Sequence, residues 1–231
     1  MPGTSTQQIA KHYTHGLGEL GADIVVIRVN DLNRDAAYQA RAQGTYSGVH
    51  HNKSWLGRRG GLWLLLEKNL VVASRLLFPD RWPRKLQFDA DAATHRFSES
   101  LEALVTLCRQ DGATVVLFDG VGMLRAGQSP LRQRKAAASL LYYMPFMTIP
   151  GLLHARQAYA RAQQEVARRT GSLFVDIGDV VPADGTYFAD ANHYRDAGSF
   201  LAAQALAQTL IDAGIVGRSA KAAGRLSPQQ D

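Results

Sequence analysis

The sequence predicts an α/β protein in which a parallel sheet is flanked by helices. Three short apolar runs, each rich in β-branched residues, suit strands that are covered on both faces. Amphipathic segments with helical spacing separate these runs, and strands that alternate with helices form right-handed parallel crossovers. The 231 residues have room for one large domain. The three expected strands are 23–29, 113–118 and 172–177.

The first third of the chain begins with a helix over residues 4–20. Ile9 and Tyr13 recur there at helical spacing, and Gly21 follows as a stop signal. The first strand comes next. Beyond it the chain is polar, and no periodicity is readable until residue 55.

Residues 36–93 form an insertion between the first two strands. Apolar residues within 55–78 predict one or two amphipathic helices, which end before Pro79. An acyl pocket or lid, a patch that contacts a membrane surface and an accessory helical layer all fit this segment. The sequence does not choose between them. All three tryptophans lie in the insertion: Trp55, Trp63 and Trp82.

The second half of the chain alternates between strands and helices with clear boundaries. In the helix 151–169, the spacing puts Leu152 and Tyr159 inside and Arg156 outside. Cys108 lies on the apolar face of another helix and is expected to be a small buried hydrophobe. The other helices are expected over 94–110, near 131–141 and over 194–213, and the polar tail 217–231 is expected to be disordered, which leaves 1–216 as the folded domain.

Composition and charge exclude several classes of function. The net charge is +6, but the basic residues are scattered and are not interleaved with aromatic side chains, so we expect no nucleic-acid partner. A single cysteine cannot form an internal disulfide. No apolar run reaches the roughly 20 residues that a membrane-spanning helix needs. The composition leaves the compartment undetermined.

The sequence predicts no metal and no organic cofactor. The pairs His12/His15 and His50/His51 come without carboxylates or cysteines at ligand spacing. The run 119–122, Asp-Gly-Val-Gly, lacks the lysine and hydroxyl residue of a phosphate-binding loop. Its glycines are therefore expected to form turns.

The clearest functional signal is the run 188–193, Phe-Ala-Asp-Ala-Asn-His, just before the last helix. An aspartate three residues before a histidine can fold back and accept the Nδ1 proton of the imidazole, which leaves Nε2 free to act as a base. We therefore expect Asp190 and His193 to be two members of a catalytic triad. The alternative for His193 is a capping or packing role at the start of the helix.

A second polar residue is expected on the same side of the sheet. Asn30 directly follows the first strand, and the Asp190–His193 run follows the third. Ligands of parallel sheets bind outside the carboxyl ends of the strands. We therefore expect these side chains on one rim, with Asn30 offering an amide donor. The alternative for Asn30 is turn formation at the end of its strand.

These motifs resemble the SGNH (GDSL-type) hydrolases, a family of serine esterases, lipases, thioesterases and carbohydrate deacetylases. The segment 3–9 looks like the family's glycine turn at the oxyanion hole. Residues 24–31 look like the strand that ends in its Gly-x-Asn-Asp element, and residues 190–193 look like its closing Asp-x-x-His element. The resemblance covers residues 1–213 and implies a three-layer, flavodoxin-like fold.

The resemblance assigns roles to four residues and implies no metal or cofactor. His193 would be the general base, and Asp190 would orient it. The Gly3 backbone N–H and the Asn30 side-chain amide would donate hydrogen bonds to the oxyanion of a tetrahedral intermediate. One departure is Arg28, which stands where the family usually has a glycine.

The family's nucleophilic serine lies in a Gly-Asp-Ser element upstream of the glycine turn, whereas only Met1 and Pro2 precede Gly3 here. We therefore expect the chain to be N-terminally incomplete, with Met1 an internal methionine or the chain a fragment. The strand 24–29 would then have an unpaired apolar edge. The chain alone would be weakly active or inactive. Ser5 is expected to start the first helix, not to attack an ester.

Three hypotheses of function follow. The first is a serine hydrolase of SGNH type that cleaves a small-molecule or carbohydrate ester, or a thioester, through an acyl-enzyme. The second is a non-catalytic α/β domain that binds carbohydrate or a protein partner on the same rim. The third is an acyl transferase, in which a sugar acceptor replaces water.

Overall fold

The computed structural model describes residues 5–46 and 85–217, together with a few single positions between 63 and 77. These residues form an α/β fold around a three-stranded parallel sheet, in the strand order β1-β2-β3. Each strand overlaps one of the apolar runs, so the sequence predicts the sheet correctly. The strands are β1 (Ile24–Ile27), β2 (Thr114–Asp119) and β3 (Leu173–Asp176).

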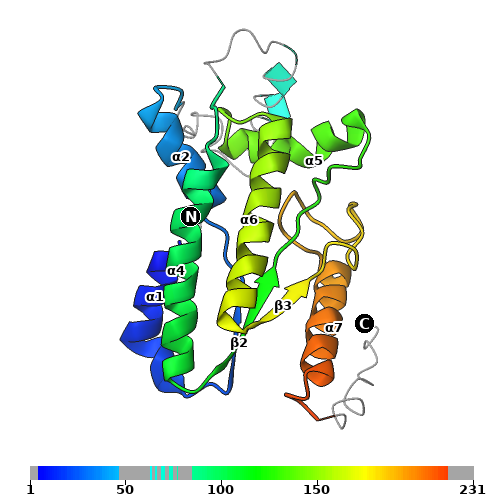
Figure 1. Ribbon diagram of the computed structural model, residues 1–231. Helices are drawn as coiled ribbons and strands as arrows, with labels where there is room; N and C mark the ends of the chain where they lie inside the picture. The colour runs from blue at the N-terminus through cyan, green and yellow to red at the C-terminus, as the bar shows by residue number, and fades with distance from the viewer. Residues whose placement is uncertain are drawn as a thin grey trace.

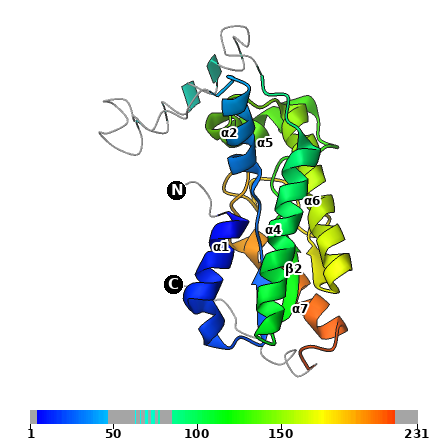
Figure 2. The ribbon, with the colours of Figure 1, turned by 60° about the vertical axis from the view of Figure 1, so that its left-hand side comes forward.

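Helices cover the two faces of the sheet unequally. On one face, α1, α4 and α6 run alongside one another (Figures 1 and 2), and they pack with α5 and the Val115 and Leu117 side chains of β2. On the other face, α7 covers Val116 and Phe118. Successive residues of β2 thus enter two different cores, which is why the strand is apolar throughout. The helices are α1 (Thr6–His12), α4 (Ala90–Gln110), α5 (Pro130–Tyr143), α6 (Ile149–Thr170) and α7 (Asp196–Asp212).

The predicted first helix is broken in the structure. Only its first part, α1, is α-helical, and a π-helical turn η1 (Tyr13–Leu17) and a 3-10 turn η2 (Gly18–Leu20) follow. Gly16 has φ of 155°, a backbone conformation that is open to glycine and costly for other residues. Gly21 ends the segment at φ of 58°, as predicted.

The sequence analysis missed one helix, α2 (Leu32–Ala42), in the stretch without readable periodicity. Its buried face includes Ala36 and Ala40, which are completely buried but too small to give a strong apolar pattern. Gln39 also faces inward, where its side chain donates to the carbonyl of Asp89 and accepts from the Asp89 N–H, both at 2.8 Å. Polar side chains thus fix α2 against the segment that leads into α4.

The expected insertion 36–93 therefore starts and ends within the main core, since α2 and α4 both belong to it. The helices expected within 55–78 lie largely outside the described residues, as does the tail from residue 218 onward. Cys108 is completely buried, as predicted. None of the described helices is long and apolar enough to cross a membrane.

The helix α6 ties α2 and the end of β1 together through buried hydrogen bonds. The hydroxyl of Tyr159 donates to the carboxylate of Asp35 in α2, and the amide of Gln163 donates to the carbonyl of Val29 at 2.6 Å. Burial raises the pKa of both Asp35 and Tyr159. A protonated Tyr159 therefore remains a hydrogen-bond donor at neutral pH, and the chain that leaves β1 is held in one position.

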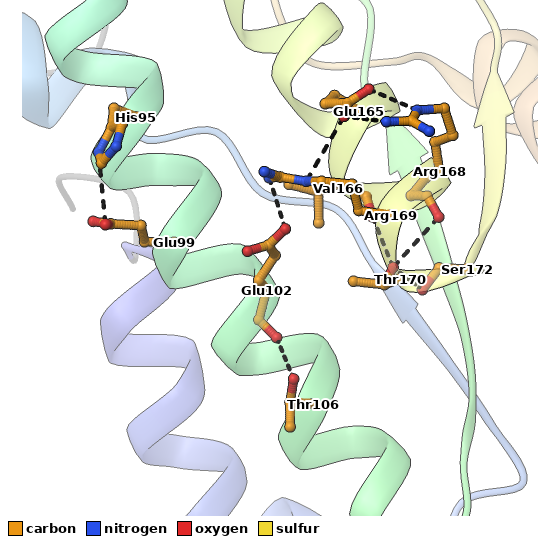
Figure 3. Close-up of polar contacts among 11 residues, drawn as sticks. His95, Glu99, Glu102, Thr106, Glu165, Val166, Arg168, Arg169, Thr170 and Ser172 are labelled. Carbon is orange, nitrogen blue, oxygen red and sulfur yellow. Dashed lines mark hydrogen bonds and ion pairs between the residues drawn. The ribbon is translucent and has the colours of Figure 1, made fainter.

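An ion pair also connects α4 and α6 on the protein surface, beside others within each helix (Figure 3). Arg169 of α6 reaches Glu102 of α4 at 2.7 Å, and Arg168 pairs with Glu165 within α6 at 2.7 Å. Exposed pairs of this kind contribute about 0 to 1 kcal/mol to stability. The apolar packing beneath these ion pairs therefore contributes most of the stability of the contact between α4 and α6.

On the face of the sheet that α7 covers, the side chains of β2 and β3 are buried more completely than those of β1. Val26 of β1 points to this face and remains 43% exposed, and Phe200 on the outer side of α7 is 63% exposed. Within the described part of the chain, no strand pairs with the outer edge of β1. Among the described residues, β1 is therefore an edge strand, as the sequence predicts.

We predict that replacing Val26 by lysine reduces self-association of the chain. A charge on an exposed edge strand opposes edge-to-edge pairing, and the free energy of unfolding should change by about 1 kcal/mol or less because the site is at the surface. Light scattering as a function of protein concentration measures the effect. Val116→Lys is the contrasting variant: its side chain is completely buried, so the protein should not fold. Equal association of Val26→Lys and the unmodified chain would contradict the prediction.

Candidate active site

The polar residues singled out by the sequence follow the carboxyl ends of the strands. Asn30 comes three residues after β1, Asp119 ends β2, and the loop 177–195 links β3 to α7. Figure 1 shows this loop beside the chain that leaves β2, beyond the arrowheads of the sheet. We refer to this edge of the sheet as the rim.

Asp190 organises the loop around His193. One oxygen of its carboxylate accepts the backbone N–H of Asn192 at 2.9 Å and that of His193 at 3.1 Å. The imidazole Nδ1 of His193 lies 2.8 Å from Oδ2 and 2.9 Å from Oδ1. Because a carboxylate only accepts, Nδ1 carries a proton in this contact, and in the neutral imidazole the lone pair is then on Nε2. This is the contact that the sequence predicts between the two side chains.

The environment of the pair keeps Asp190 ionised. Partial burial raises the pKa of Asp190, but the two N–H groups and the imidazole outweigh it and hold the pKa below its ordinary value. The His193 side chain is 78% exposed, so Nε2 is accessible from solvent. The catalytic role of the two residues stays a prediction, since orientation of an imidazole is required for base catalysis but does not prove it.

The loop that carries the pair is fixed from below by the chain after β2. The N–H of Met123 donates to the carbonyl of Ala191 at 2.9 Å, and the hydroxyl of Tyr194 donates to the carbonyl of Val121 at 3.0 Å. Phe188 is buried in the core under α7. His193 thus stands on a segment anchored on both sides, although its own ring is exposed.

Asn30 forms a turn through its side-chain oxygen and leaves its amide nitrogen available as a donor, so it combines features of both roles that the sequence allows. Its Oδ1 accepts the N–H of Leu32 at 2.8 Å, which is the turn interaction at the start of α2. Its amide nitrogen has no hydrogen-bond partner among the described residues and lies on an exposed side chain. The nitrogen can therefore serve as a donor, and the oxyanion role of Asn30 stays a prediction.

The start of α1 is attached to the end of β1. The buried carboxylate of Asp31 accepts the N–H of Thr6 at 2.9 Å. Ser5 caps α1, since its Oγ accepts the N–H of Gln8 at 3.2 Å, as predicted. Gly3 lies outside the described residues. The structure therefore brings the chain just after Gly3 close to Asn30, and leaves Gly3 itself untested.

The side chain of Arg28 reaches across the rim to the loop of His193. Its guanidinium lies 4.9 Å from the centre of the Tyr194 ring, a cation–π contact between the end of β1 and the residue after His193. Any side chain at Gly120 would collide with this guanidinium. Gly120 thus leaves room for the Arg28 side chain, where the sequence predicted only a turn.

The prediction that Arg156 points outward is wrong. Its Nη2 donates to the Oδ1 of Asn192 at 3.3 Å, and its Nη1 is buried without a hydrogen-bond partner in the described structure. A side chain at Gly122 would collide with this guanidinium and with the carbonyl of Ala191. Arg156 therefore lies under the loop of His193.

Two charged groups at the rim have pKa values that differ from their ordinary ones. Burial, and then the charge of Asp176, raises the pKa of Asp119. Burial, and then the charge of Arg125, lowers the pKa of Arg156 to about 10. Both changes reflect the cost of holding charge away from water, and with a pKa of about 10 Arg156 remains charged at neutral pH.

Sequence reasoning missed this arginine cluster because its members come from different elements. Arg28 follows β1, Arg125 lies in the loop after β2, and Arg156 belongs to α6. Only the glycines at 120 and 122 gave a local signal, since glycine often marks a close approach of another group. Among the described residues, no group of histidine, cysteine and acidic side chains could hold a metal.

Comparison of the chain with protein-family models, curated proteins and solved structures gives no match. The resemblance to SGNH hydrolases therefore depends on the residues alone. No serine hydroxyl within the described ranges makes a hydrogen bond to His193. Among the described residues, the rim thus presents an oriented imidazole and an amide nitrogen without a hydrogen-bond partner.

We predict that Asp190→Asn lowers the free energy of unfolding at pH 7 by about 0.5 kcal/mol, because solvent screens a pair of which the carboxylate is 39% exposed. Since the pKa of Asp190 is lowered in the folded state, its contribution is present above the unfolded pKa of about 4 and is lost as the pH falls further. Urea unfolding of both proteins at pH 7 and pH 3 measures it. A difference that grows toward pH 3 would contradict this sign.

Proposed function

We propose that the chain carries the acid–base part of an SGNH-type serine hydrolase that cleaves an ester or thioester through an acyl-enzyme. The observation that carries this proposal is the contact of Asp190 with Nδ1 of His193, with Nε2 exposed at the carboxyl edge of a parallel sheet. The free amide of Asn30, which also follows the end of a strand, supports it. The nucleophilic serine would come from outside the described residues.

In this mechanism His193 transfers one proton in each half of the reaction. The serine oxygen bonds to the carbonyl carbon while Nε2 takes the serine proton, and the carbonyl oxygen becomes an oxyanion. The imidazolium is stabilised by Asp190. Nε2 then returns the proton to the leaving alkoxide or thiolate as the tetrahedral intermediate collapses. Water repeats the same two steps on the acyl-enzyme and releases the acid.

The Asn30 amide would act on the charge that develops in this reaction. A fixed donor aimed at an oxyanion is typically worth about 3 to 4 kcal/mol of transition-state stabilisation. The turn bond from Leu32 holds the Asn30 side chain by its oxygen, so its nitrogen is oriented before substrate binds. Gly3 would add a backbone N–H to the same oxyanion.

A second function is favoured by one observation, namely that no described serine makes a hydrogen bond to His193. A non-catalytic domain that binds carbohydrate or a protein partner on the rim would need no nucleophile. An acyl transferase would need the same groups as the hydrolase, with a sugar hydroxyl in place of water. The two chemical hypotheses therefore share one test, and the binding hypothesis is its negative outcome.

The experiment measures hydrolysis of an aryl acetate by the 231-residue chain and by any longer product of the same reading frame that carries a Gly-Asp-Ser element. We expect the chain alone to be close to the uncatalysed rate. If the reading frame encodes such a longer protein, His193→Ala in it should lower kcat by roughly 10³-fold or more, because a triad acts as one unit. His154→Ala, an exposed histidine of α6, is the matched control and should leave kcat unchanged. Equal rates of the longer protein and its His193→Ala variant would overturn the proposal.

A further inference from the structure

Two arginines at the rim lack a counter-charge within ion-pair distance. Among the described residues, neither Arg125 nor Arg156 has a carboxylate oxygen within 4.0 Å, although ion pairs of that length occur elsewhere in the fold. Their hydrogen bonds are long: Arg125 donates to the carbonyl of Val181 at 3.4 Å, and Arg156 to Asn192 at 3.3 Å. Both guanidinium groups are thus partly buried and have few acceptors.

This arrangement is costly without an anion. The Nη1 of Arg156 is buried and makes no hydrogen bond in the described structure. A buried charged donor without an acceptor loses its hydration and gains nothing in exchange. The two cations also repel each other, and burial lowers the pKa of both. The folded chain nevertheless holds them together, with Gly122 leaving space for Arg156.

Asp119 does not neutralise the pair. Its carboxylate interacts with Arg28, Arg125 and Arg156 only through space, with no ion pair between them within 4.0 Å, and Asp176 repels it. Asp176 and Asp179 also attract Arg125 through space, but neither lies within 4.0 Å of it. The guanidinium donors of Arg125 and Arg156 therefore remain without a carboxylate acceptor among the described residues, on the side of the rim that borders the loop of His193.

We propose that Arg125 and Arg156 form an anion-binding subsite for a carboxylate or phosphate group of the substrate. Guanidinium groups match the geometry of both anions, because each presents two parallel N–H donors to two oxygens. Arg156 contacts Asn192, which directly precedes His193, so the bound anion lies next to the proposed reacting centre. The inference rests on the proposed function for its substrate class, an ester that carries a negative charge, but the subsite itself does not require hydrolysis.

The first experiment measures binding alone on the complete 231-residue chain. Inorganic phosphate and acetate are titrated separately at constant pH and ionic strength, with chloride as the balancing anion, and the ¹⁵Nε–¹H signals of the arginines are followed. We expect saturable shifts of the Arg125 and Arg156 signals. Stronger binding of phosphate assigns a phosphate-bearing substrate, and stronger binding of acetate a carboxylate-bearing one. Shifts that do not saturate, or that chloride reproduces, would overturn the inference.

Variants then locate the subsite. Arg156→Gln should raise the dissociation constant of the preferred anion at least tenfold, because charge-assisted hydrogen bonds are lost. Arg161→Gln removes the same charge from an exposed position of α6 and should leave the constant within about twofold. If Arg156→Gln does not fold, Arg125→Gln tests the same loss. Equal effects of the subsite and control variants would contradict the assignment.

The inference and the proposed function can fail separately. In any longer product of the reading frame that hydrolyses esters, the proposal predicts at least a tenfold higher kcat/KM for an aryl ester with a terminal carboxylate or phosphate than for the neutral ester. Arg156→Gln should remove this preference. If anions bind saturably but His193→Ala does not reduce hydrolysis, the proposed function is refuted and the anion subsite is supported. Hydrolysis that depends on His193, without anion binding or charge preference, would refute the subsite alone.

Discussion

The position of His193 depends on the contact between the loop that follows β3 and the chain that leaves β2. Met123 and Tyr194 make the two hydrogen bonds of this contact, through the carbonyls of Ala191 and Val121. Arg156 fills the space beneath the loop, and only a glycine at position 122 leaves room for it. Asp190 then sets the ring, but it can do so only because the loop is already in place. A mobile loop would give the same two residues no fixed direction.

The parallel sheet explains why charge gathers at this edge. Carboxyl ends of adjacent strands meet there, so side chains that are distant in sequence become neighbours. The same edge holds acids from the ends of β2 and β3 and arginines from three segments. The pKa of Asp119 is raised there and that of Arg156 is lowered, whereas a close ion pair would lower the first and raise the second. Clusters of this kind are frequent at functional sites. By contrast, the surface of α4 and the C-terminal part of α6 carry ordinary exposed ion pairs.

The sequence predicts the elements with strong periodicity and misses those that depend on tertiary contacts. The three strands and the helices α4, α6 and α7 have continuous apolar patterns, and their existence is correctly predicted. The helix α2 is missed because alanines and an inward glutamine replace large apolar residues on its buried face. The contact of Asp190 with His193 is local and therefore readable. Arg156 was misplaced because helical spacing identifies a face of a helix but not what a long side chain reaches from it.

The central claim is that the ends of β1 and β2 and the loop of His193 form one rim, and the contact of Arg28 with Tyr194 tests it most directly. The guanidinium lies 4.9 Å from the ring centre. Nuclear Overhauser effects between the Arg28 side-chain protons and the Tyr194 ring, with upfield ring-current shifts of the arginine protons, are the expected result. Both should disappear in Tyr194→Leu. Random-coil shifts of Arg28 and no cross-peaks to Tyr194 in the folded protein would show that the two segments do not meet, and the account of the site would fail.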